Sequence, residues 1–132
     1  MSVPALDAHA LLAYLEREAG FAKVKDHFAQ ALSEGNLLPM TTVNVGEVLY
    51  IVRREQGADN AAKIESVIHS LPIALTDVDL ELAREAARFK ADGGLSYADC
   101  FAAALASLHQ IPLLTGDPEF KVVEGKIAIE WL

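Results

Sequence analysis

Short apolar runs alternate with amphipathic segments along the whole chain. The apolar runs at 3–6, 37–40, 71–75, 111–114 and 127–131 predict strands, and apolar side chains spaced three and four residues apart predict helices at 9–18, 21–32, 43–56, 58–70, 80–92 and 97–106. No Asn-Gly hairpin signal joins two strands. The pattern therefore predicts an α/β fold, a three-layer α/β/α sandwich with a central parallel sheet, in a single domain spanning 1–132.

Composition agrees with a globular chain. Its 132 residues are 52% hydrophobic and 23% charged, enough to bury a core. No apolar run approaches the roughly 20 residues of a membrane span, and the N-terminus lacks the pattern of a signal peptide, so we expect a cytoplasmic protein with no membrane partner. The single cysteine, Cys100, excludes an internal disulfide and is expected to be a small buried hydrophobe.

The charge of the chain bears on its partners. Nineteen acidic residues against eleven basic ones give a net charge of -8, which argues against broad electrostatic binding to nucleic acid. The bases form three groups on predicted helices, at 23–25, 53–54 and 84–90. Each group is by default a solvated helix face, and a rim that contacts phosphate is the alternative.

One carboxylate interrupts the most apolar segment. Asp99 follows Ser96 and precedes a run of alanines, so the helix should be buried on every face. Ser96 and Asp99 fit a capping box, which is a purely structural role for the acid. A buried ionised carboxylate must otherwise be paired, protonated or bound to a metal.

Three further acids occupy comparable positions. Asp7 follows the first predicted strand, Glu47 lies in the first turns after the second, and Asp117 follows the fourth. Each has an ordinary explanation as a cap, helix or turn residue. Parallel strands, however, gather ligands at their carboxyl ends, where all four acids would converge without a base close in sequence to Asp7, Glu47 or Asp99. A carboxylate cup of this kind favours Mg2+ or Mn2+ and phosphate chemistry.

Polar neighbours of these acids could support such a site. Asn44, Thr115 and either Thr41 or Thr42 are placed to orient carboxylates or waters. Capping and turn roles explain them equally well.

Four segments carry a family resemblance. Segments 6–12, 42–48, 95–104 and 114–120 contain Leu-Asp-Ala-His, Thr-Val-Asn-Val-Gly-Glu, Leu-Ser-Tyr-Ala-Asp and Thr-Gly-Asp-Pro-Glu-Phe. In this order they resemble the four acidic motifs of PIN-domain ribonucleases, and most of all those of the VapC toxins of type II toxin-antitoxin systems.

The resemblance implies a metal-dependent endoribonuclease that hydrolyses RNA phosphodiester bonds with Mg2+ or Mn2+. It also implies a homodimer and inhibition by a cognate antitoxin protein. Asp7 and Asp99 would be the principal metal ligands, Glu47 and Asp117 would complete the catalytic cup, and Glu119 would stand near a fifth acid of some members.

The chain departs from the family at one position. His9 stands where members often carry Ser or Thr. It is either an added phosphate contact or general acid, or a histidine bonded to a neighbour at the helix start.

Two other classes of function compete with the nuclease. The cup could bind a metal or a basic peptide without catalysis, as a regulatory module that acts through an antitoxin partner. A phosphoacceptor domain or aspartate phosphatase shares the strand-then-Asp layout, but Ala8-His9 supplies no second Asp and no lysine follows Leu114.

Overall fold

The computed structural model describes residues 3–132 and has the alternation that the sequence predicts. The elements in chain order are β1 (Ala5–Leu6), α1 (Ala8–Leu15), α2 (Phe21–Glu34), β2 (Leu38–Thr41), α3 (Thr42–Gln56), α4 (Ala58–Ser70), β3 (Ile73–Thr76), α5 (Leu80–Asp92), α6 (Tyr97–His109), β4 (Leu113–Thr115), a 3-10 helix η1 (Pro118–Val123) and β5 (Ile129–Trp131).

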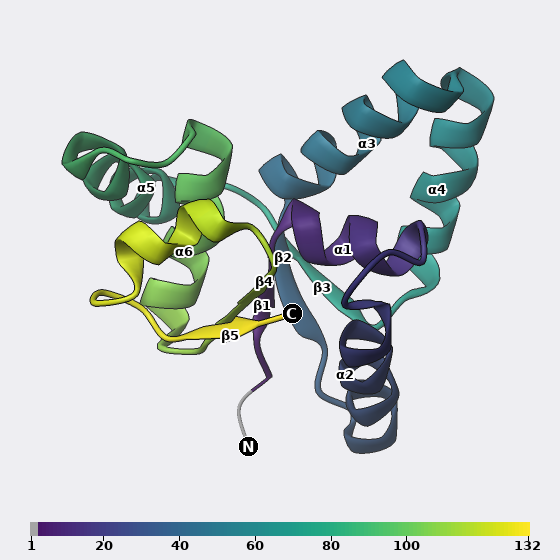
Figure 1. Cartoon of the computed structure of the whole chain (residues 1–132), viewed down its shortest axis with the longest axis horizontal. Coiled ribbons are helices and arrows are strands. Elements are labelled where there is room, and N and C mark those ends of the chain that lie inside the picture. Colours follow the sequence, from purple (N-terminus) through teal and green to yellow (C-terminus); the bar gives the residue numbers. More distant parts are fainter. Residues whose placement is uncertain (1–2) are drawn as a thin grey trace.

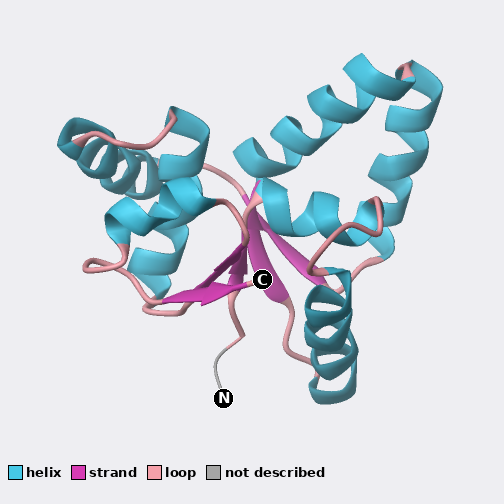
Figure 2. Ribbon diagram, viewed as in Figure 1, coloured by secondary structure: helices cyan, strands magenta, loops and turns pink. Residues whose placement is uncertain are grey.

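All strand pairs are parallel, as predicted. One ladder has the order β1-β4-β5, and β2 pairs with β3 in a second ladder that lies beside β1. Figure 2 shows the strands gathered between the helices. The chain steps from β1 to β2 and β3 on one side and then returns to β4 on the other side of β1. The carboxyl ends of β1 and β4 therefore flank the topological switch point, where ligands bind in such sheets.

Successive strand residues feed two separate cores. In β1, Ala5 packs into a cluster with α5 and α6, whereas Leu6 packs into a cluster with α1 to α4. Leu113 and Leu114 of β4 divide in the same way. Because neighbouring side chains of a strand point to opposite faces, this alternation makes the sheet the middle layer of three. Figure 1 shows α5 and α6 on one side and α1, α3 and α4 on the other.

The alanine helix is buried as predicted. Residues 99–106 of α6 are all buried, and Cys100 is a fully buried free thiol. The alanines among them, residues 102–104 and 106, let α6 pack closely against α5 and the sheet. Among the described residues, no helix combines the length and the hydropathy that crossing a bilayer requires.

Aspartates cap α5 and η1. The Asp79 carboxylate accepts from the Leu82 amide at the start of α5, at 2.9 Å, after Thr76 has paired with Thr41 in the sheet. The 3-10 helix η1 was not predicted. Asp117 caps it by accepting from the Glu119 amide at 2.9 Å, and Pro118 begins it.

The packing of α6 gives a stability prediction. Ala103→Leu adds three heavy atoms where Ala103 has no exposed surface, so the free energy of unfolding should fall by about 1–3 kcal/mol. Ala91→Leu, on an exposed position of α5, should change it by less than about 0.5 kcal/mol. Urea denaturation of both variants measures the difference. Equal stability of the two variants would contradict the close packing of α6.

Candidate metal centre

Asp7 lies at the point where β1 passes into α1. Its Oδ1 accepts from the Ala10 amide at 2.8 Å, so the predicted N-cap is present, and its Oδ2 accepts from the Thr115 hydroxyl at the end of β4. The same Thr115 Oγ1 accepts from the Asp117 amide at 3.0 Å. One hydroxyl thus fixes Asp7, which is only 2% exposed, against the turn that carries Asp117.

Asn44 joins the second and third acidic segments. Its Oδ1 accepts from the Thr41 hydroxyl at 2.6 Å, and its Nδ2 donates to the Ala98 carbonyl at 3.0 Å. Ala98 precedes Asp99, so the first turn of α3, one turn before Glu47, is held against the first turn of α6. Asn44 has no exposed surface, and its long-range bond to Ala98 makes it a spacer between the acids.

The tightest carboxylate group contains Asp99, Asp117 and Glu119. One oxygen of each lies within 4.8 Å of the other two. Asp99 is almost fully buried and its amide donates to Ser96 Oγ at 3.2 Å, as the predicted cap requires. Asp117 is partly buried and Glu119 is exposed. The group therefore opens from the core toward solvent.

Asp7 is the most buried of these acids, and its pKa is strongly raised. Burial raises the pKa of Asp7 to about 7, against the hydrogen bonds from Thr115 and Ala10, and the charges of Asp99 and Asp117 add to the rise. The effect of these two charges on Asp7 places all three carboxylates in one electrostatic site.

Asp99 and Glu47 belong to the same site. Burial raises the pKa of Asp99 to about 6, against a hydrogen bond with Ser96, and the charges of Glu47, Asp117 and Glu119 raise it further. Burial likewise raises the pKa of Glu47, against a hydrogen bond with Asn44, and Asp117 adds to the effect. The structure thus places Asp99 and Asp117 in one close group with Glu119, whereas Asp7 and Glu47 lie outside that group but near enough for their charges and those of Asp99 and Asp117 to interact.

The acids lack protein cations in the described part of the chain. The ion pairs found among residues 3–132 all lie elsewhere: His27–Glu130, His69–Glu65, Arg88–Glu85 and Lys126–Asp92. Glu47 Oε1 is buried without a hydrogen-bond partner. A set of carboxylate oxygens with an unsatisfied buried acceptor fits a hard divalent cation such as Mg2+ or Mn2+.

His9 lies beside the cup. A Cβ on Gly116 would fall 2.6 Å from Cε1 of the His9 ring, so only glycine lets the ring lie against the turn before Asp117. His9 is exposed. This placement leaves the ring free to meet a ligand at the mouth of the cup.

Glu119 lies closer to the other acids than the sequence predicts. It was set beside the cup as a possible fifth acid, whereas the structure puts it in the tightest trio. The signal was present, because Glu119 stands two residues after Asp117, but the 3-10 turn that brings both toward Asp99 was not foreseen.

Comparison with known proteins bears on this architecture. The family model of the PIN domain matches residues 5–126. The chain belongs to the PIN-domain family. No curated protein sequence matches it.

Solved structures share the PIN fold of this chain. They include DNA-bound VapBC from Salmonella typhimurium, with 16% identity, TM-score 0.76 and 98% of each chain covered. VapC20 of Mycobacterium tuberculosis, described as a Sarcin-Ricin loop cleaving toxin, has 16% identity and TM-score 0.69 over 89% of this chain and 92% of that one. DNA-bound VapBC2 from Rickettsia felis has 12% identity and TM-score 0.75 over 98% of each. The predicted three-layer fold is confirmed.

The raised pKa values predict how pH affects stability. Unfolded Asp and Glu lose their protons near pH 4, but in the fold Asp7 and Asp99 keep theirs to about pH 7 and 6. Between these limits the folded state binds more protons, so the free energy of unfolding of the metal-free protein falls as pH rises. We expect the Tm in EDTA to drop on the order of 5–10 °C from pH 5 to pH 8.

Mg2+ should oppose this loss, because it binds the ionised carboxylates. Differential scanning fluorimetry should show a larger Tm increase on adding Mg2+ at pH 8 than at pH 5. Asp7→Asn should flatten the pH dependence, whereas Asp26→Asn on exposed α2 should not. A metal-free Tm that rises steadily to pH 8 would contradict the buried cluster.

Proposed function

We propose that this chain is a metal-dependent endoribonuclease of the PIN family, acting in the cytoplasm as the toxin of a toxin-antitoxin pair. The observation that carries the proposal is the convergence of Asp7, Glu47, Asp99 and Asp117 at the switch point of the sheet, without an ion-pair partner among residues 3–132. Family membership and the likeness to VapC structures support it. We further propose that residues 1–132 form one domain.

The ion that the cup fits, Mg2+ or Mn2+, supplies an activated water and polarises the scissile phosphoryl group when bound. Asp7 and Asp99, the two most buried acids, are proposed as its principal ligands. Glu47 and Asp117 complete the cup. As they are less buried, they are placed to orient the attacking water and to accept its proton.

Two neutral side chains keep these acids in position. Thr115 donates to Asp7 Oδ2 and so directs Oδ1 toward the Ala10 amide, which fixes the carboxylate plane. Asn44 sets the distance between Glu47 and Asp99 through its bond to the Ala98 carbonyl. Such outer partners orient metal ligands and typically affect affinity or activity about 10–100-fold.

The proposed partners are RNA, a second copy of the chain and a cognate antitoxin. The similar structures from Salmonella typhimurium and Rickettsia felis are VapBC assemblies bound to DNA, which supports an antitoxin partner. With a net charge of -8, this chain favours a basic antitoxin segment over free nucleic acid.

A matched pair of variants tests the nuclease. Asp7 and Asp79 are both helix N-caps, but only Asp7 belongs to the cup. Asp7→Asn should lower the cleavage rate of single-stranded RNA in Mg2+ or Mn2+ by more than about a hundredfold, since even outer-shell changes cost up to that much. Asp79→Asn keeps a capping side chain and should leave the rate within about twofold.

Asp99→Asn should match Asp7→Asn, and excess EDTA should stop cleavage by the unmodified protein. Circular dichroism checks that each variant is folded. Full activity of either cup variant, or activity in EDTA, would contradict the proposal. A folded protein that is inert toward RNA with both ions would favour the non-catalytic regulatory module.

A further inference from the structure

The face of α3 next to the cup continues outward with an aromatic and a basic side chain. Glu47, Tyr50 and Arg54 stand at positions i, i+3 and i+7, so they form one row on the helix. At 1.5 Å of rise per residue the row extends about 10 Å from the cup. A strand whose phosphate lies at the cup would pass Tyr50 and Arg54 next.

Tyr50 is open to solvent despite its size. The side chain is 52% exposed, and the Arg54 guanidinium carbon lies 5.4 Å from its ring centroid. Tyr97, the other exposed tyrosine near the cup, instead packs its ring against Phe101. An exposed ring with an adjacent guanidinium is the combination that binds the bases and phosphates of single strands.

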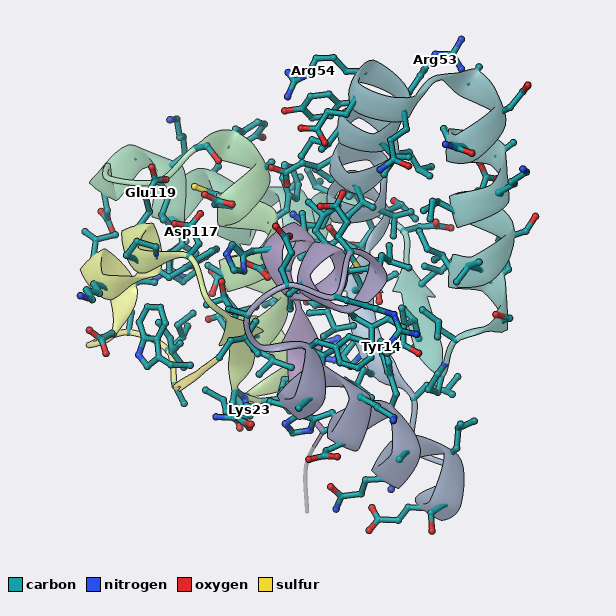
Figure 3. All side chains as sticks on the ribbon, turned by 45° about the vertical axis from the view of Figure 1, so that its right-hand side comes forward. Tyr14, Lys23, Arg53, Arg54, Asp117 and Glu119 are labelled. Atoms are coloured by element: carbon teal, nitrogen blue, oxygen red, sulfur yellow. The ribbon has the colours of Figure 1, made fainter. Side chains whose placement is uncertain are left out.

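The two arginines at the end of α3 point to different sides. In Figure 3 Arg54 extends to the side on which Asp117 and Glu119 lie, and Arg53 extends away from it. The acid beside them, Glu55, lies near Glu16, whose pKa is raised by burial and by the charges of Glu18 and Glu55. Arg54 is thus a positive charge at the end of α3, on the side of the helix that faces the cup.

The charge balance of the chain makes such a contact necessary. A net charge of -8 and a cup of carboxylates both repel a polyanion. A substrate phosphate therefore needs a cation close to the site, and Arg54 is placed to supply it.

We infer that Tyr50 and Arg54 bind the single-stranded RNA segment beside the scissile phosphate, with a base stacked on the Tyr50 ring and the next phosphate bound by the Arg54 guanidinium. The inference rests on the proposed nuclease function and names its substrate class. Double-stranded RNA, whose bases are already stacked, would not use the ring.

Binding, measured without cleavage, tests this surface. The full chain carrying Asp7→Asn is titrated in Mg2+ against a fluorescein-labelled single-stranded RNA of about eight nucleotides, with fluorescence anisotropy as the readout. Tyr50→Ala and Arg54→Ala should each raise the Kd about tenfold. Tyr50→Phe, which keeps the ring, should stay within about twofold.

Arg53→Ala is the matched control for charge. It removes the same charge from the neighbouring residue and should also stay within about twofold, whereas Arg54→Ala should lower the salt dependence of binding by about one phosphate contact. A duplex of the same sequence should show no effect of Tyr50→Ala.

Three results would overturn the inference: equal losses in Arg53→Ala and Arg54→Ala, no change of Kd in Tyr50→Ala and Arg54→Ala, or no binding of this RNA. Unchanged RNA binding with a shifted monomer-dimer equilibrium in sedimentation would make the face a protein contact. RNA cleavage by the unmodified chain separates this inference from the proposed nuclease function. If the unmodified chain cleaves RNA and the Tyr50 and Arg54 variants bind RNA normally, only this inference fails. If those variants bind RNA weakly but the unmodified chain never cleaves it, only the nuclease proposal fails.

Discussion

Mutual repulsion among carboxylates at the carboxyl ends of β1 and β4 is the constraint that governs this site. Burial raises the pKa of Asp7 to about 7, and the charges of Asp99 and Asp117 add to the rise. The protein gives the cluster neutral hydrogen-bond donors, such as Thr115, and no ion pair within residues 3–132. A divalent cation bound among these carboxylates would offset the repulsion, because it would lower the pKa of every carboxylate that it contacts.

The fold makes this convergence by simple means. A return of the chain to the far side of β1 places the ends of β1 and β4 next to each other, and Thr115 joins them through one hydroxyl. Elsewhere in the site, Asn44 holds the start of α3 to the start of α6. Small side chains in α6 allow a helix bearing a carboxylate to enter the core. Rigid elements, rather than long loops, therefore carry the acids, which suits a site that must keep a fixed geometry.

Much of this was predictable from the sequence, and the rest depended on tertiary contacts. The positions of Asp7, Glu47 and Asp117 after strands, and of Asp99 in an alanine helix, sufficed to predict one site, because strand direction in a parallel sheet is fixed by the connections. The closeness of Glu119 to Asp99 depends on a 3-10 turn too short to show periodicity, and the approach of His9 to Gly116 depends on a packing distance that no local pattern encodes.

Anomalous diffraction from crystals grown with Mn2+ tests the convergence of the acids on one cation, since it locates the ion independently of activity. This convergence predicts a peak bounded by Asp7, Asp99 and Asp117, with carboxylate oxygens at about 2.0–2.3 Å and waters filling the remaining positions. Saturating Mn2+ with no peak at the switch point, or with a lysine or arginine side chain neutralising the acids instead, would contradict it.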